Sequence, residues 1–182
     1  MRYLGTLLIV LGIIGLDLGT KWFAEKHYLL YSSERAISIY SSKRDLITNI
    51  GSLQSENSSW VRLSITYVRN TGAAWGFMGS LSETYRPLFF KLITIFLILL
   101  LIFVFIRSPH STYAYLGYSW VLGGACGNLI DRYYLHYVVD WIDVEWNLFH
   151  WQYQFPIFNI ADVAINIGAV FLILDSFLRK KR

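Results

Sequence analysis

One apolar segment near the end of the chain, FPIFNIADVAINIG at residues 155–168, carries Asn159, Asp162 and Asn166. At about 100° per residue these three positions fall at roughly 0°, 300° and 340° around a helix, so they form one narrow stripe. The next basic residue of the segment is Arg179, at its far end. An unpaired carboxylate inside a membrane costs about 2.5 to 3.5 kcal/mol, and such residues are functional by default. Asp162 is therefore the first candidate for chemistry.

Paired carboxylates remain once other chemistries are excluded. The chain has no HExxH, no GxSxG and no Gly-rich phosphate-binding motif, and its four histidines are scattered without metal-ligand spacing. Two Asp groups that share one proton can hydrolyse an amide, because one accepts a proton from water while the other donates one to the carbonyl oxygen. Poor hydration and mutual repulsion keep one of the two protonated. Spacing alone leaves Asp131, Asp140 and Asp143 open as the partner of Asp162.

Polar residues at helical spacing also occur on two other apolar segments. Asp17 and Lys21 are an i, i+4 pair that can neutralise each other. Gly124, Asn128 and Asp131 form a second stripe, in which the small residue allows close approach of another helix. We expect such stripes to face the interior of a helix bundle. Packing between helices is the simplest explanation for three charged residues near helix ends, namely Asp17, Lys21 and Arg132.

The composition indicates that these segments lie in a membrane. The chain has 182 residues, of which 55% are hydrophobic, 18% aromatic and only 15% charged. Its mean hydropathy is +0.42, which is too apolar for an ordinary soluble domain. About 20 apolar residues are needed to cross a bilayer. We therefore predict a mainly α-helical membrane protein, one integral membrane domain over residues 1–182, with four spans at about 3–24, 87–106, 113–131 and 156–177.

Two features near these spans have simple explanations. Arg2 precedes an apolar run, as in a secretory signal, but no A-x-A-like cleavage site follows, so we expect this segment to remain as a membrane helix. Cys126 is the single cysteine, which excludes an intramolecular disulfide, and it has no second ligand at metal spacing. We expect neither a metal nor a cofactor.

The basic residues predict the orientation. The net charge is +4, and Arg2, Arg107 and the tail at 179–182 fall on one side if four helices alternate across the bilayer. The positive-inside rule places that side, with both termini, in the cytoplasm. The polar groups of the first, third and fourth spans then meet near the outer face. The basic tail is explained by topology, and we expect no nucleic-acid binding.

Two regions lie outside the predicted spans. Residues 25–86 contain a Ser-rich insert at about 32–59, followed by alternating apolar residues at 61–68 that predict a strand. The GAAWGFMG segment after the strand is typical of backbone packed closely against another part of the protein. Residues 132–155 are rich in Trp and Tyr, which predicts a loop at the membrane surface.

At this point the motifs match a known family. The chain resembles the lipoprotein signal peptidases, or signal peptidase II, which are aspartic peptidases of the bacterial inner membrane. The matching blocks occur in the family's order and span nearly the whole chain: DLGTK (17–21), NTGAAWGF (70–77), GGACGNLIDR (123–132), VVDW (138–141) and FNIADVAINIG (158–168). GNxxDR, VVD and FNxAD together are highly specific, whereas any one of them alone is not.

The resemblance implies a catalytic dyad of Asp140 and Asp162, a choice that periodicity could not make. It also implies that a further set of residues holds the site or contacts substrate: Asp17, Lys21, Asn70, Gly124, Asn128, Asp131, Arg132, Asn159 and Ala161. The implied substrate is a prolipoprotein whose lipobox cysteine carries a diacylglyceryl group, cleaved just before that cysteine. The implied fold has four transmembrane helices, a small extracytoplasmic β-rich cradle and a mobile segment lying on the membrane. The expected partners are these substrates and membrane lipids, and the expected state is a monomer.

The chain departs from the family pattern in two aromatic positions and one insert. Trp141 and Trp75 stand where the family has Phe, and the Ser-rich insert lengthens the loop after the first span. Two other functions stay open: a small proton- or cation-coupled transporter that uses the intramembrane Asp pair, and a non-catalytic assembly partner. Four spans leave little room for a transport pathway, and no pair of broken helices is evident.

Overall fold

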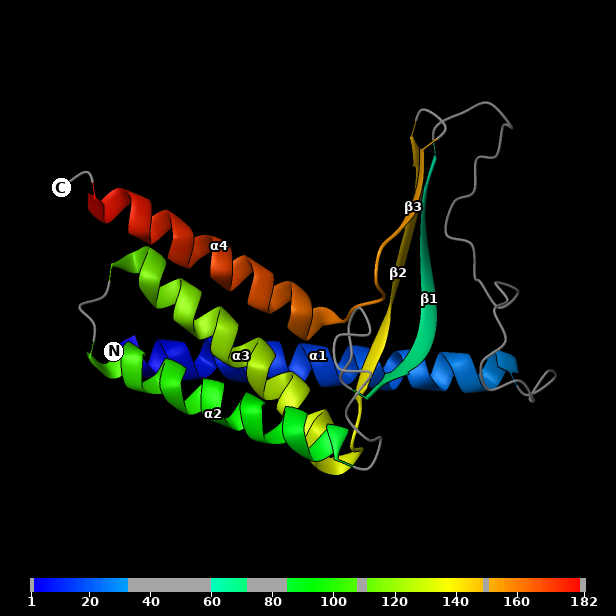
Figure 1. Ribbon diagram of the computed structural model, residues 1–182, viewed down its shortest axis with the longest axis horizontal. Helices are drawn as coiled ribbons and strands as arrows, with labels where there is room; N and C mark the ends of the chain where they lie inside the picture. Colours follow the sequence, from blue (N-terminus) through cyan, green and yellow to red (C-terminus); the bar gives the residue numbers. More distant parts are fainter. Residues whose placement is uncertain (1, 33–59, 72–84, 108–110, 149–150, 181–182) are drawn as a thin grey trace. The chain divides into compact units, whose positions relative to one another are not determined.

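The structure is a computed structural model that describes residues 2–32, 60–71, 85–107, 111–148 and 151–180. The described part is mainly helical with one small sheet (Figure 1). Its elements in chain order are α1 (Arg2–Ser32), β1 (Trp60–Asn70), α2 (Arg86–Arg107), α3 (Thr112–Tyr134), β2 (Val138–Leu148), β3 (Trp151–Gln154) and α4 (Ile160–Lys180). The Ser-rich insert beyond Ser32 and the GAAWGFMG segment lie outside the described residues.

The chain divides into two compact units. The helical unit holds Met1–Gly19, Asn70–Val138 and Ile160–Arg182, and the sheet unit holds Thr20–Arg69 and Val139–Asn159. Helix α1 contributes to both, because its first part belongs to the helical unit and its second part to the sheet unit.

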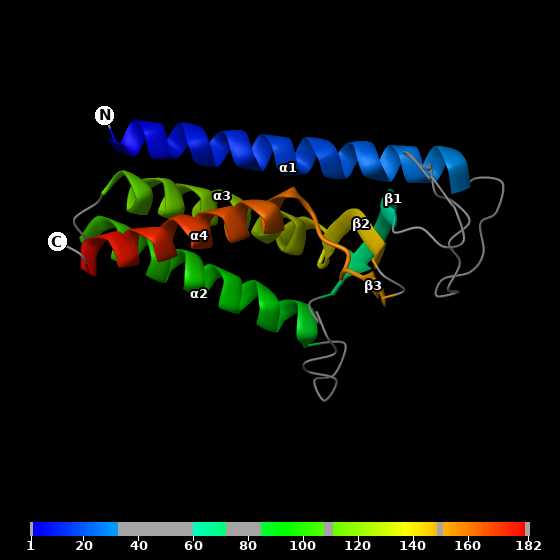
Figure 2. The ribbon, with the colours of Figure 1, turned by 90° about the horizontal axis from the view of Figure 1, so that it is seen from above.

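Glycines allow the helices of the helical unit to pack closely. Helix α3 lies beside α4 and α2, and beside the first part of α1 (Figures 1 and 2). A Cβ atom on Gly117 of α3 would lie 2.9 Å from the carbonyl oxygen of Gly168 on α4, and one on Gly168 would lie 2.7 Å from that of Gly117. A Cβ on Gly123 would lie 2.9 Å from Ile13 of α1. Small residues of this kind are what helix association in lipid requires.

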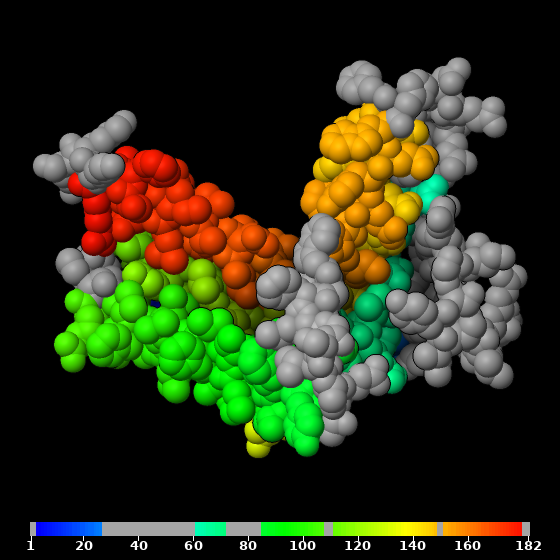
Figure 3. Space-filling model, in the orientation of Figure 1, coloured from blue at the N-terminus to red at the C-terminus, as the bar shows by residue number. Residues whose placement is uncertain are grey.

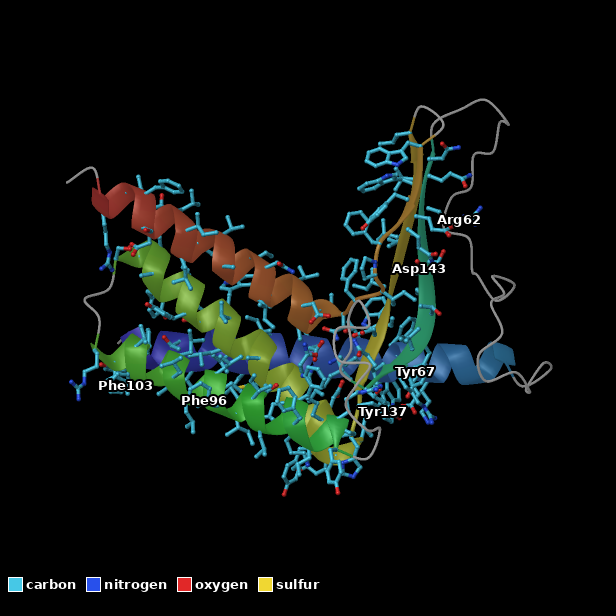
Figure 4. The ribbon with its side chains drawn as sticks, viewed as in Figure 1. Arg62, Tyr67, Phe96, Phe103, Tyr137 and Asp143 are labelled. Carbon is cyan, nitrogen blue, oxygen red and sulfur yellow. The ribbon has the colours of Figure 1, made fainter. Side chains whose placement is uncertain are left out.

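The outward faces of the helices are apolar. Phe96 and Phe103 of α2 are 62% and 55% exposed, and both project away from the neighbouring helices (Figure 4). In the space-filling view, side chains of α2 cover the near face of the helical unit and those of α4 lie above them (Figure 3). Among the described residues, Tyr3–Lys26, Arg86–Arg107 and Ile160–Arg179 are long and apolar enough to cross a membrane.

Helix α3 is the predicted span that does not meet this measure of length and apolarity. It has 23 residues, but it buries polar groups such as Ser119, Asn128 and Asp131. These polar groups lower its hydropathy because they serve contacts inside the unit. Ser119 Oγ, for example, donates to Thr6 Oγ1 of α1 at 3.2 Å.

A charged cluster joins α3 to the C-terminal end of α4. Ser111 is the N-cap of α3, where its hydroxyl accepts from the Ala114 N–H at 3.1 Å. The same hydroxyl donates to Asp175 of α4. Arg179 pairs with Asp175 at 2.8 Å, so the predicted i, i+4 ion pair is confirmed. One buried carboxylate therefore links a helix cap and a basic side chain.

We expect Asp175→Ala to lower the stability of the protein by about 1 to 3 kcal/mol, because the Ser111 hydroxyl and the Arg179 guanidinium would both lose their acceptor. Thermal unfolding in detergent measures the change. Rates of substrate cleavage at a temperature where the variant is folded should stay close to those of the wild type. A melting temperature equal to that of the wild type would show that the cluster adds nothing to stability.

The sheet unit contains a three-stranded sheet in the order β1-β2-β3. Strands β2 and β3 are antiparallel, with Glu145 opposite Gln154 and Leu148 opposite Trp151. Strand β1 contains the alternating segment for which a strand was predicted. The aromatic region at 132–155, predicted only as a surface loop, instead supplies β2 and β3. Its Trp and Tyr residues suit strands as well as interfaces, which is why composition alone did not separate the two.

A bulge ends this pairing before α4. The Phe155 N–H donates to Val144 O, whereas Phe158 pairs with Ile142, so the 155–158 segment has one residue more than its partner strand. Pro156 lies in this extra length, where its missing N–H removes no ladder hydrogen bond. Helix α4 therefore begins at Ile160, later than the predicted start of the span at 156.

Candidate active site

In the helical unit, Asp162 lies in the first turn of α4 and accepts a hydrogen bond from α3. Asn128 Nδ2 donates to Asp162 Oδ1 at 2.8 Å. Asn128 is buried, with 5% of its surface exposed, while Asp162 is partly exposed. Because the N-terminal end of a helix carries a partial positive charge, a carboxylate in the first turn is stabilised there. Asp162 is thus oriented by a neighbouring helix and stays accessible.

A second carboxylate holds the same end of α4. Asp17 of α1 is fully buried, and its Oδ1 accepts the backbone N–H of Ala161 at 2.9 Å. The first N–H groups of a helix have no partner within the helix, so Asp17 acts as a cap supplied by another helix. The i, i+4 spacing of Asp17 and Lys21 pointed only to a local pair and gave no sign of this contact.

Two glycines of α3 make room for this arrangement. A Cβ on Gly127 would lie 2.7 Å from Asp17 Oδ2. One on Gly124 would clash with the carbonyl oxygen of Ala161 and lie 2.8 Å from Ile165 Cγ1. Gly124 was singled out from sequence, whereas Gly127 was missed. The signal was present in the GGACG segment, where small residues recur at helical spacing.

We expect Asp17→Ala to lower stability by about 0.5 to 2 kcal/mol, the usual effect of removing a helix cap, and to reduce cleavage because the first turn of α4 carries Asp162. Asp17→Asn keeps an oxygen that can accept the Ala161 N–H, so it should recover most of both losses. Thermal unfolding and cleavage rates would be measured together. Equal losses in the two variants would show that the negative charge of Asp17, and not its acceptor oxygen, is what matters.

In the sheet unit, Asp140 lies in β2 and is held by Asn159. Asn159 Nδ2 donates to Asp140 Oδ1 at 2.7 Å and to Val139 O at 3.2 Å. Asp140 is 3% exposed and Asn159 is fully buried. Each of the two units therefore presents one Asp whose side chain accepts a hydrogen bond from an Asn, Asn128 in one case and Asn159 in the other.

The other predicted residues have more varied surroundings. Asp131 is buried on α3, where its carbonyl oxygen accepts the Leu135 N–H that caps the helix. Arg132 donates to Asn128 O at 3.3 Å. Lys21 is buried on α1, and Asn70 ends β1.

One of the three partners that spacing left open lies on the surface of the sheet. Asp143 Oδ1 accepts from Gln154 Nε2 at 3.2 Å, an exposed contact across the hairpin. Asp131 and Asp140 are both buried, with 4% and 3% of their surfaces exposed. Burial alone therefore separates Asp143 from the other two.

The predicted polar stripe of α4 needs correction. Asn159 precedes the helix and binds Asp140, so it does not belong to a helical stripe with Asp162. Asn166 is exposed instead of facing the bundle interior, and its amide donates to Asp162 O, one turn earlier, at 2.9 Å. Bonding to its own helix backbone satisfies the amide without a partner from another helix.

Within the described ranges, no group of three or more His, Cys, Asp or Glu side chains is arranged to hold a metal ion. The polar side chains described above are carboxylates and amides. What they can do is position and transfer protons.

Known proteins show what this combination belongs to. The sequence profile of signal peptidase (SPase) II matches residues 9–178, which include both Asp140 and Asp162. The chain belongs to the signal peptidase II family. It is 37% identical to a lipoprotein signal peptidase of Shewanella pealeana over 91% of each chain. It is 34% identical to one of Haemophilus ducreyi, over 93% of this chain and 89% of the other.

Solved structures agree with this membership in the signal peptidase II family. A bacterial membrane enzyme solved by the in meso method at 2.3 Å is 31% identical, with a TM-score of 0.63 over 97% of this chain and 89% of the other. A second such structure, at 1.9 Å, has a TM-score of 0.62. Membership in the signal peptidase II family makes the protein a protease of the membrane and gives no support to the transporter alternative.

Proposed function

We propose that this protein removes the signal peptide from prolipoproteins that carry a diacylglyceryl group on the lipobox cysteine, cleaving just before that cysteine. The family match over residues 9–178 is the observation that carries the proposal. Relatives that share 30 to 45% identity with the chain are named lipoprotein signal peptidases. The amide network around each candidate carboxylate supplies the chemistry that such a cleavage requires.

The proposed catalytic residues are Asp140 and Asp162, which act as an aspartic dyad. One carboxylate accepts a proton from the attacking water, and the protonated member donates a proton to the scissile carbonyl oxygen. Asn159 orients Asp140, and Asn128 orients Asp162, through the hydrogen bonds described above. Fixed amide donors lower the reorganisation needed as charge moves between the carboxyl groups and the substrate.

The other proposed positioning residues support these four. Asp17 and Ala161 hold the first turn of α4, and Gly124 allows α3 to approach it. Arg132 binds the backbone of the α3 turn that carries Asn128. Lys21, Asn70 and Asp131 are assigned to the site on the family motifs alone.

The proposed location is the bacterial inner membrane, with the site near its outer face. Helix α3 would be the fourth span, because it packs against α2 and α4 and has enough length to cross. The basic residues at both termini place these in the cytoplasm under the positive-inside rule. The proposed working state is a monomer surrounded by lipid.

Cleavage of a synthetic lipobox peptide by the purified protein tests the function. The peptide would carry a diacylglyceryl group on its cysteine, and the control peptide would have the same sequence with a free thiol. Mass spectrometry should show one cut, immediately before the lipidated cysteine, and little or no cleavage of the control. Cleavage at another bond, or a folded protein that cuts neither peptide, would contradict the proposal.

A further inference from the structure

The sheet of the sheet unit has two chemically distinct faces. Successive residues of a strand point to opposite faces, so Ile142, Val144, Trp146 and Leu148 of β2 share one face. The register places Tyr153 opposite Trp146 and Trp151 opposite Leu148, on that same face. Ring contacts join its members: the Trp146 centroid is 4.7 Å from that of Phe155 and 5.6 Å from that of Tyr153. We call this surface the aromatic face.

The opposite face carries the polar and charged groups. Arg62 of β1 pairs with Glu145 of β2 at 3.5 Å, and Gln154 of β3 donates to Asp143 of β2. Arg62 projects from the sheet on the side opposite to the ring-bearing side chains of β2 and β3 (Figure 4). The alternation of β1 places Val61 and Leu63 on the aromatic face, since each is next to Arg62 in the strand. The charges of the hairpin are therefore confined to one side.

Much of the aromatic face is open to its surroundings. The exposed fractions are 70% for Trp151, 38% for Leu148, 59% for Val61 and 48% for Leu63. An apolar surface of this kind, edged by polar residues, marks an interaction site. Trp and Tyr prefer the headgroup level of a bilayer, because they combine an apolar ring with a polar group.

We propose that the aromatic face is a membrane-docking surface, which inserts into the interfacial layer of the outer leaflet. Two observations favour lipid as its occupant. The face carries Trp and Tyr without a charge on β2 or β3, which suits an interface and not the surface of a charged protein. In addition, β3 is joined to α4, a helix able to span a membrane, by residues 155–159 alone, so the chain keeps this hairpin near the bilayer surface.

A pair of neighbouring positions on β3 provides a matched test. In a Cys126→Ala background of the full chain, Trp151→Cys and Gln152→Cys would each be labelled with the fluorophore NBD. The protein would be reconstituted in phosphatidylcholine and phosphatidylglycerol vesicles with or without brominated acyl chains. The label at position 151, on the aromatic face, should be quenched by bromine roughly twofold or more relative to the label at position 152.

A second pair on β2 shows whether loss of the Trp151 ring itself disturbs the face. Leu148→Cys and Asn147→Cys lie opposite Trp151 and Gln152, so their labels should repeat the same difference. Thermal unfolding would confirm that the labelled variants are folded. Equal quenching of the two faces in both pairs would overturn the proposal.

Three further outcomes identify another occupant or separate this proposal from the proposed cleavage. Protection of the position 151 label from both bromine and aqueous iodide would mean that protein covers the face, which overturns lipid docking. A response that appears only when the lipidated lipobox peptide is added would assign the face to substrate and overturn it too. The same quenching difference in the Asp140→Asn variant, or in a protein that cleaves nothing, would support docking independently of catalysis.

Discussion

We expect Asp140→Asn and Asp162→Asn each to reduce the rate of lipobox cleavage by about 10²- to 10⁴-fold, the usual contribution of a general acid or base. Asn has nearly the shape of Asp but can neither accept a proton from water nor return one to the substrate. The side chain at position 162 could still bond to Asn128, and the one at position 140 to Asn159, after an amide rotation. The loss should therefore fall on turnover, with little change in thermal stability.

Asp143→Asn is the matched control, because Asp143 lies in the same strand as Asp140 and was an equal candidate from spacing alone. Its partner is Gln154, so its cleavage rate should remain near that of the wild type. Substrate cleavage by all three variants would be measured in detergent at a temperature below their unfolding transitions. Activity that survives in Asp140→Asn and is lost in Asp143→Asn would mean that the dyad has been assigned wrongly.

The second large effect concerns packing between α3 and α4. Gly124→Ala would place a methyl group against the carbonyl oxygen of Ala161 and within 2.8 Å of Ile165 Cγ1. Because the first of these is a backbone atom in a helix, one helix must move. Overpacking of this kind lowers stability by about 1 to 3 kcal/mol, which corresponds to about 2 to 4 °C in Tm per kcal/mol for a chain of this length. Cleavage should also fall, since the displaced turn precedes Asp162.

Gly15→Ala provides a control for the change in helix propensity. Gly15 lies in α1, and a Cβ there would have no neighbour within 4 Å. Ala is favoured over Gly within a helix by about 1 kcal/mol, so this variant should be as stable as the wild type or more stable. The comparison isolates the steric term at Gly124. Equal melting temperatures for Gly124→Ala and the wild type would show that α3 and α4 can separate without loss.

Local patterns predicted the helices and one strand well, because these depend on residues near one another in sequence. The apolar runs of α1, α2 and α4 have the length that a bilayer requires, and the alternation through Val61 and Leu63 predicted β1. The pattern failed for β2 and β3, where aromatic residues serve both strands and membrane surfaces. It also extended the α4 helix too far, because the bridge between Phe158 and Ile142 is a contact across the fold.

By itself, the sequence determined the class of protein, the family and the acidic residues available for catalysis, because motifs and apolar runs are properties of the chain in one dimension. Only the tertiary structure decided the partners of those residues. Asn128 binds Asp162, Asn159 binds Asp140 instead of joining a helical stripe, and Asp17 caps α4 across 144 positions of sequence. Such contacts depend on where separate helices and strands end in space. Helical periodicity describes the faces of one element, and it carries no information on which atoms of another element meet them.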